Sequence, residues 1–167
     1  MTEPELAQLY REYGYFLFRR CFAYLGDTSR AQDALQEVFV RALRSMNGFR
    51  GDAHPRTWLC RIADHLCIDL LRRDQRSPFA SLDPRAGPGA ELESVMLADD
   101  GDALRAVRGL MASLDPSEQR LAVLHFADEL TQDEIAAELS LSRRTVGKRI
   151  KALRERARHL LDPEGHA

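Results

Sequence analysis

The chain has 167 residues, of which 44% are hydrophobic and 30% are charged, and its formal net charge is −2. This balance is typical of one ordinary globular domain or two small ones, and it excludes a chain that is disordered throughout. No apolar run approaches the roughly 18 residues of a membrane span, and the acidic start MTEPELAQ is unlike a secretory signal. The sequence therefore predicts a cytoplasmic protein without membrane insertion.

Three amphipathic helices are predicted in the first half of the chain, because apolar residues recur there at intervals of three and four. Gly26 ends the first helix, and Ser29 with Gln32 has the spacing of a capping box that would begin the second. Two glycines in residues 47–54 predict a loop, after which Pro55 suits the first turn of the third helix. The expected helices cover about residues 6–25, 29–46 and 55–73.

Apolar spacing also predicts which side chains of these helices are buried. On the second helix the inward face is expected to comprise Ala31, Leu35, Val38, Ala42 and Leu43. On the third helix it is expected to comprise Trp58, Leu59, Ile62, Leu66 and Leu70. The polar side chains that should project elsewhere from the third helix are Arg56, Arg61, Asp64, His65 and Arg72.

The composition changes over residues 77–102, which hold three prolines, three glycines and six acidic residues against Arg85. An ordered, structureless stretch of this length is unusual inside a compact domain, so it is predicted to be a flexible acidic linker. We expect a first domain over residues 1–76 and a second over residues 103–167.

The second domain is predicted to open with a helix over residues 103–114. Asp115-Pro116-Ser117-Glu118 then combines an N-cap with a proline start, which predicts a helix to about residue 127. Thr131 and Glu134 again have the spacing of a capping box, and Ser142 supplies a further N-cap. Two more helix starts therefore follow within a short distance.

Residues 130–161 predict a short helix, a tight turn and a long basic helix, which is the pattern of a helix-turn-helix DNA reader. Ser140 stands in the turn, where such motifs usually have a glycine that can adopt left-handed backbone, so a cost on the order of 1 kcal/mol is expected there. The two helices would pack through Ile135, Ala136, Leu139, Leu141, Val146, Ile150 and Leu153.

The last helix is strongly basic, since residues 143–161 carry eight Lys or Arg against Glu155 alone. Such a stripe attracts phosphates, arginine can hold guanine bidentately, and serine or threonine can bond a base or a phosphate. The candidates for reading a major groove are Ser142, Arg143, Arg144, Thr145, Lys148 and Arg149. The alternative is a helical hairpin whose basic face is merely solvated.

In the first domain, the loop from Phe49 to His54 and the helix start that follows mix aromatic, cationic and hydrogen-bonding side chains. This mixture suits unpaired bases, because aromatic and guanidinium planes stack on an extruded base at about 1 to 3 kcal/mol each. The alternative for Trp58 is a core position, which its spacing favours.

No catalytic or metal-binding motif is apparent. The chain has no glycine-rich phosphate loop, no H-E-x-x-H and no nucleophile elbow, so we expect no enzyme, no cofactor and no metal. Three cysteines at scattered spacing argue against a disulfide framework. Cys60 and Cys67, with His65 nearby, leave a metal or redox site as a minor alternative to the packing of reduced thiols.

Three motifs in order carry a resemblance to a known family: SRAQDALQEVFVRAL, then FRGDAHPRTWLCRIADHLCIDLLRR, and, after the acidic linker, DPSEQRLAVLHFADELTQDEIAAELSLSRRTVGKRIKALRERAR. Over about residues 6–161 the chain resembles the extracytoplasmic-function (ECF) class of bacterial RNA polymerase sigma factors, in the sigma-70 family. The resemblance implies an all-α protein of two small helical domains. The first would bind core RNA polymerase and open promoter DNA at the −10 element, and the second would read the −35 element.

The resemblance also implies residue roles and a further partner. Contacts with core polymerase would come from Asp33, Gln36, Glu37 and Arg41, whose alternative is an ordinary solvated face. The −10 element would be contacted by Phe49, Arg50, Asp52, His54, Arg56, Trp58, Arg61 and His65, with Asp64 near the melted strand. His65 stands where family members often have asparagine, which leaves the base preference open. An anti-sigma factor would hold the protein inactive.

Two other classes of function remain possible from the residues alone. One is a plain helix-turn-helix transcriptional regulator with an N-terminal helical interaction domain. The other is an interaction protein that sequesters regulators through its amphipathic helices.

Overall fold

The computed structural model describes residues 3–45, 54–76 and 101–161. Within these ranges the chain forms helices and no β-strand, which confirms the all-α prediction. No helix in the same ranges is long and apolar enough to cross a membrane. The chain divides into two compact units, unit 1 within Met1–Met96 and unit 2 within Leu97–Ala167.

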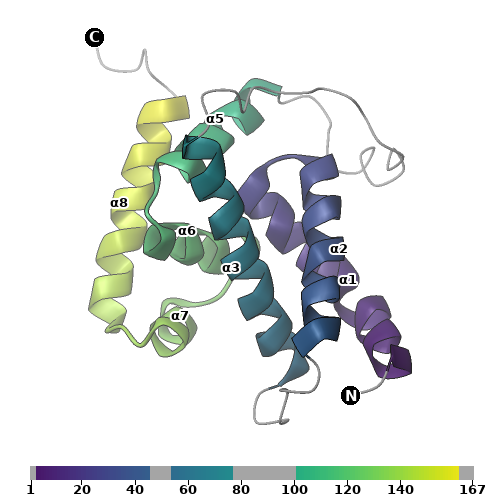
Figure 1. Ribbon diagram of the computed structural model, residues 1–167. Coiled ribbons are helices and arrows are strands. Elements are labelled where there is room, and N and C mark those ends of the chain that lie inside the picture. The colour runs from purple at the N-terminus through teal and green to yellow at the C-terminus, as the bar shows by residue number, and fades with distance from the viewer. Residues whose placement is uncertain (1–2, 46–53, 77–100, 162–167) are drawn as a thin grey trace. The chain divides into compact units, whose positions relative to one another are not determined.

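Unit 1 is a bundle of three helices, each of which packs against the other two (Figure 1). The helices are α1 (Glu3–Leu25), α2 (Thr28–Ser45) and α3 (Pro55–Arg76), close to the predicted extents. Gly26 has a φ of 60°, and this left-handed residue ends α1 as predicted. The fully buried side chains at the centre of the bundle include Leu17, Cys21, Val38, Leu59, Ala63 and Cys67.

Two predictions for α2 are wrong. The helix is capped by Asp27, whose Oδ1 accepts the backbone N–H of Arg30 at 2.8 Å, and not by Ser29. Asp27 is the N-cap because it directly follows the glycine that ends α1, so its carboxylate faces the first unsatisfied backbone N–H groups of α2. Leu43, predicted to be buried, is 42% exposed.

Asp64 of α3 was expected to project outward, but only 3% of its surface is exposed. Arg20 donates from Nε to Asp64 Oδ1 at 2.6 Å and from Nη2 to Asp64 Oδ2 at 2.9 Å. Tyr24 lies one turn after Arg20 on α1, and its hydroxyl donates to Asp64 Oδ1 at 3.0 Å. The carboxylate therefore joins α1 to α3 inside the core, where a paired and hydrogen-bonded charge is tolerated.

Burial, with the negative charge of Asp64, holds the pKa of the Tyr24 hydroxyl well above its usual value. Above about pH 10 the unfolded chain therefore loses the Tyr24 proton while the folded chain keeps it, so the free energy of unfolding of unit 1 should fall. Tyr24→Phe should reduce this alkaline loss. The measurement is urea unfolding at neutral and alkaline pH, followed by the fluorescence of Trp58, the single tryptophan of the chain.

Tyr15, which lies on α1 with 59% of its surface exposed, provides the matched control for that measurement. Tyr15→Phe should lose as much stability at alkaline pH as the unsubstituted chain. An alkaline loss that Tyr24→Phe leaves undiminished would contradict the role given to Tyr24.

The cysteines of unit 1 are free thiols in different surroundings. Cys67 is buried against Cys21, and a hydrogen bond with that thiol, together with burial, raises the pKa of Cys67. A thiol with a raised pKa is a poor nucleophile and a poor metal ligand. Cys60 is half-buried and His65 is exposed, and the described residues contain no group of three or more His, Cys, Asp or Glu placed to hold a metal ion.

Unit 2 is built from α5 (Gly101–Ser113), α6 (Pro116–Ala122), η2 (Val123–Ala127), α7 (Gln132–Leu139) and α8 (Arg143–Leu161). The long helix α8 contacts α5, α6 and α7 (Figure 1). The predicted helix to residue 127 has the right extent, but its last five residues form a π-helix, η2, which no sequence signal indicated. The core side chains of this unit are Met111, Leu114, Leu121, Ala122, Val123, Leu124, Ile135, Val146, Ile150 and Leu153.

Candidate nucleic-acid interface

The predicted helix-turn-helix is present in α7 and α8. Thr131 caps α7 by accepting the backbone N–H of Glu134, and the Glu134 carboxylate accepts the backbone N–H of Thr131 in return, which confirms the capping box. Hydrogen bonds from Thr131 lower the pKa of Glu134. In the turn, Ser140 is left-handed with φ 53° and ψ 43°, and the N–H of Leu141 donates to the carbonyl of Ala136 at 2.9 Å. The motif thus uses serine in the conformation where glycine was expected.

Ser140→Gly should stabilise unit 2 by about 0.5 to 1 kcal/mol, because glycine adopts the left-handed conformation without the Cβ penalty. The measurement is urea unfolding followed by far-ultraviolet circular dichroism. The Trp58 fluorescence transition, which reports unit 1, should not move. Ser140→Ala is the control, since alanine keeps the Cβ and should give no gain. A loss of stability in Ser140→Gly would show that the serine side chain supports the turn.

The N-terminal end of α8 is capped as predicted. Ser142 Oγ accepts the backbone N–H of Thr145 at 3.1 Å, and the two hydroxyls lie 2.8 Å apart. Both candidate hydroxyls are therefore already joined to each other at the entry of the helix. No acidic residue lies in the first turn of α8. A capped helix N-terminus without acidic neighbours in its first turn favours an anion such as a DNA phosphate.

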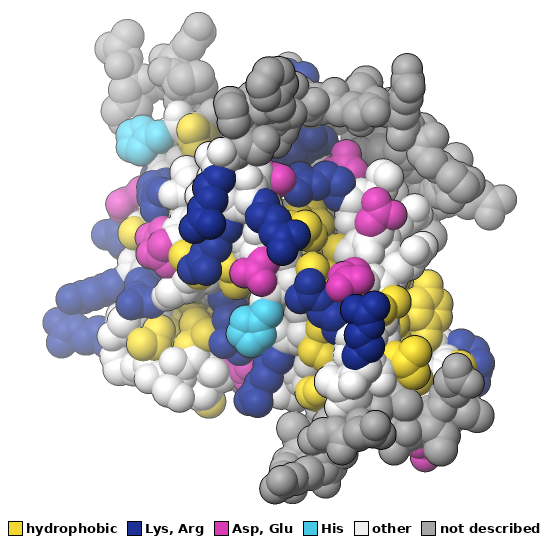
Figure 2. Space-filling model, in the orientation of Figure 1, with side chains coloured by type: hydrophobic (Ala, Val, Ile, Leu, Met, Phe, Trp, Pro, Cys, Tyr) yellow, Lys and Arg dark blue, Asp and Glu magenta, His cyan; other side chains and the backbone are white. Residues whose placement is uncertain are grey.

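Three predicted cations project from the N-terminal half of α8. The side chains of Arg143, Arg144 and Lys148 are exposed. Figure 2 shows Lys and Arg side chains extending from the outer side of this helix, at the left of the view. Arg143 lies 3.6 Å from the carboxylate of Asp133 on α7, but both side chains are about 70% exposed. Such an exposed pair is weak, so it leaves Arg143 able to exchange partners.

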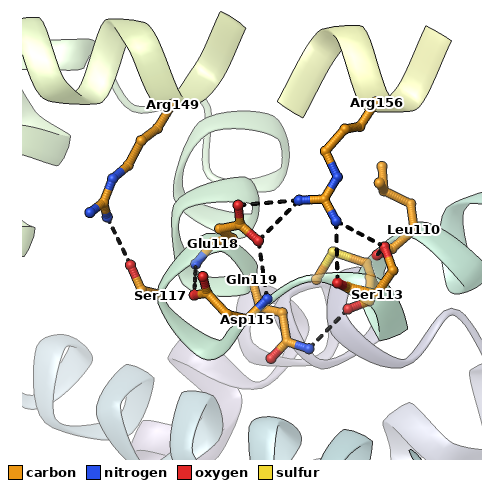
Figure 3. Close-up of polar contacts among 9 residues, drawn as sticks. Leu110, Ser113, Asp115, Ser117, Glu118, Gln119, Arg149 and Arg156 are labelled. Carbon is orange, nitrogen blue, oxygen red and sulfur yellow. Dashed lines mark hydrogen bonds and ion pairs between the residues drawn. The ribbon is translucent and has the colours of Figure 1, made fainter. Parts of the chain in front are cut away.

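Arg149, also predicted to read DNA, points back into unit 2 together with Arg156 (Figure 3). Arg149 Nη1 donates to Ser117 Oγ at 2.8 Å. Arg156 Nη1 donates to both carboxylate oxygens of Glu118 at 3.2 and 3.1 Å, and its Nη2 donates to the carbonyl of Ser113 at 3.2 Å. These contacts attach α8 to the end of α5 and the start of α6.

Part of the basic stripe is thus structural, which the count of charges did not reveal. The available signal was spacing: Arg149 and Arg156 are seven residues apart and each follows a buried residue of α8 by three positions, Val146 and Leu153. Residues at this spacing border the packed face. Arg154, four positions after the buried Ile150, contacts His125 of η2 at 3.1 Å.

The described residues of the −10 set lie at the start of α3 and along it. Four of them are exposed, namely His54, Arg56, Arg61 and His65. Trp58 is half-buried, which agrees neither with a full core position nor with a fully exposed stacking surface. Phe49, Arg50 and Asp52 lie outside the described residues. Arg61 and His65 are four residues apart and lie on one face of α3, whereas Arg56 lies on a different face of the same helix, near its start.

The four residues predicted to contact core polymerase lie on the outer face of α2. Asp33 and Gln36 are exposed, and Glu37 accepts a hydrogen bond from Arg41 Nε at 2.8 Å, which lowers the pKa of Glu37. Val40 lies on the same face and is 38% exposed. An exposed apolar residue among charges is typical of a protein-binding surface as well as of a solvated one.

Two parts of the chain match families of known proteins. Residues 9–77 match Sigma-70 region 2, and residues 104–156 match Sigma-70, region 4. The first match covers unit 1 from α1 to the end of α3, and the second covers unit 2 from α5 into α8.

Individual proteins that are similar to this chain include sigma factors. The chain is 29% identical to the ECF RNA polymerase sigma factor SigW of Bacillus subtilis, over 87% of this chain and 82% of that protein. It is 29% identical to SigX of the same organism, over 84% and 75%. The solved structure of CnrH in complex with the cytosolic domain of CnrY is similar, with a TM-score of 0.62, 27% identity, and coverage of 98% of this chain and 92% of that one. In fold alone, the chain also resembles the sigma factor RpoE, solved with the anti-sigma factor NepR from Bartonella quintana, at a TM-score of 0.63, 18% identity and coverage of 96% and 98%.

Proposed function

The chain belongs to the sigma-70 family, as an alternative sigma factor of the ECF class, and we propose that it directs core RNA polymerase to promoters. In this proposal α8 reads the −35 element and unit 1 opens the −10 element. The plain helix-turn-helix regulator is not favoured, since residues 9–77 match a sigma-factor region and not a separate sensor domain. The chain supplies sequence recognition and forms or breaks no bond itself.

For the −35 element, the supporting observation is the capped N-terminus of α8 with exposed cations on its first turns. In this proposal Arg143 and Arg144 contact base edges or phosphates, and Lys148 contacts a phosphate one turn later. Ser142 and Thr145 contribute chiefly as the cap that leaves the first N–H groups of the helix directed at DNA. Arg149 can join them only by exchanging Ser117 for a phosphate.

For the −10 element, we assign the melted strand to the start of α3 and the loop before it. His54, Arg56, Arg61 and His65 offer exposed imidazole and guanidinium planes, which stack on unpaired bases. The exposed part of the half-buried Trp58 ring is assigned to the same stacking on unpaired bases. Phe49, Arg50 and Asp52 complete the proposed set in the loop.

Three partners follow from this assignment. Core polymerase would bind the outer face of α2 at Asp33, Gln36, Glu37 and Arg41, and promoter DNA would bind both units. An anti-sigma factor is the expected inhibitor, as in the RpoE–NepR complex. We further propose domains over residues 1–76 and 103–167 joined by a linker at residues 77–102, in a cytoplasmic protein. Joining two weak DNA contacts raises their effective concentration, which favours such a linker.

The decisive experiment is transcription in a reconstituted system. Purified chain added to core RNA polymerase and genomic DNA fragments of its source should produce transcripts whose start points share upstream elements, and core enzyme alone should not. The proposal fails if no fragment yields a promoter-dependent transcript while the chain alone binds DNA tightly, which is the behaviour of a plain regulator.

A further inference from the structure

Two residues assigned to the −10 strand are in contact with aromatic side chains of α1, which apolar spacing places on one face of that helix and which are not among the predicted site residues. The guanidinium carbon of Arg56 lies 4.1 Å from the centroid of the Phe16 ring. The imidazole of His54 lies edge-on to Tyr13, with 6.4 Å between ring centroids and 79° between ring planes. The exposed start of α3 is thus held against α1 at two points.

The four side chains form one connected group. Tyr13 and Phe16 are three residues apart, so they lie on the same face of α1, and both are half-buried. His54 Nδ1 accepts the backbone N–H of Arg56 at 3.3 Å, which links the two contacts on the α3 side. A hydrogen bond with Glu12 raises the pKa of Tyr13.

The contact with Phe16 restricts a side chain that is otherwise free to rotate. An exposed arginine samples many rotamers, and ordering it on binding reduces affinity, whereas a guanidinium already held over a ring does not incur that loss. A guanidinium plane has two faces. The Phe16 ring lies on one side of the Arg56 guanidinium, and because the Arg56 side chain is exposed, its remaining surface can stack on an unpaired base.

We propose that Phe16 and Tyr13 are positioning residues for the −10 strand: they hold Arg56 and His54 in the orientation in which these two residues stack on single-stranded DNA. This inference rests on the proposed function and adds α1 to the elements that form the −10 surface. A purely structural role for the two rings would stabilise unit 1 without affecting what Arg56 contributes to DNA binding.

A double-mutant cycle tests the proposal with the full chain bound to core polymerase. The variants are Phe16→Leu, which keeps an apolar side chain but removes the ring, Arg56→Gln, and both together. The probe is a fluorescent single strand carrying the non-template −10 sequence of a promoter found by start-point mapping, and the readout is its dissociation constant. Each single variant should weaken binding about two- to fivefold, and the double variant should be no weaker than Arg56→Gln alone.

The other outcomes are distinguishable. If the effects of Phe16→Leu and Arg56→Gln multiply, Phe16 does not act through Arg56, and the inference is overturned while the assignment of Arg56 stands. If Arg56→Gln leaves binding unchanged, both fail. Tyr15→Leu on the exposed side of α1 is the matched control and should not change the affinity. If Phe16→Leu unfolds unit 1, as judged by Trp58 fluorescence, the double-mutant cycle is repeated with Tyr13→Leu and His54→Gln. Multiplying effects in that cycle overturn the inference, and a double variant no weaker than His54→Gln alone supports it.

Discussion

Replacing both Arg143 and Arg144 by alanine should lower transcription from a −35-dependent promoter by about two orders of magnitude. A single arginine contact to a base edge contributes about 1 to 3 kcal/mol, so the loss of two suffices for such a decrease. The fold should be unaffected, because both side chains are exposed and the ion pair of Arg143 with Asp133 is a surface pair. Single-round transcription with reconstituted holoenzyme measures the effect.

The matched control removes the same charge from positions of α8 outside its first two turns. Lys151 and Arg158 are exposed on α8 but lie beyond its first two turns. Lys151→Ala with Arg158→Ala should reduce transcription only a few-fold, through the general attraction of phosphate. If both double variants lose the same activity, the basic stripe acts by net charge, and the N-terminal end of α8 is not the reading element.

Asp64→Ala should destabilise unit 1 by about 3 to 5 kcal/mol, which is a large part of the stability of a small domain. The substitution removes the carboxylate that neutralises the buried guanidinium of Arg20 and accepts the Tyr24 hydroxyl. A buried charge that loses its counterion keeps its full desolvation cost. Urea unfolding followed by Trp58 fluorescence reports unit 1 selectively, because Trp58 lies in α3.

A surface ion pair in the same unit provides the comparison. Arg30 donates from Nη2 to Asp74 Oδ2 at 2.5 Å between the start of α2 and the end of α3, with side chains 41% and 37% exposed. Asp74→Ala should cost less than about 1 kcal/mol, since solvent screens the pair. Equal losses in the two variants would mean that the buried network does not hold the helices together. Arg20→Met combined with Asp64→Leu should recover part of the loss, because it leaves no buried charge.

Helix starts were predictable because a capping signal is contained within four residues. Asp115 with Glu118, Thr131 with Glu134, and Ser142 all cap where their spacing indicated. The start of α2 was predicted wrongly because two cap-forming residues, Asp27 and Ser29, stand close together. Only the position of the preceding turn determines which of them faces the free N–H groups.

The sequence by itself determined the helices, the all-α class, the helix-turn-helix and the family, because each depends on local spacing or on motifs in a fixed order. Only the tertiary structure decided which charged side chains are exposed and can bind a partner, and which are already paired within the protein. Asp64 and Arg149 stand at polar positions of their helices, yet one is buried beneath Arg20 and the other bonds Ser117. Such pairings join residues 32 to 44 positions apart. Helical periodicity predicts on which face of a helix a charged side chain lies, whereas only the packing of the helices determines which residue it contacts there.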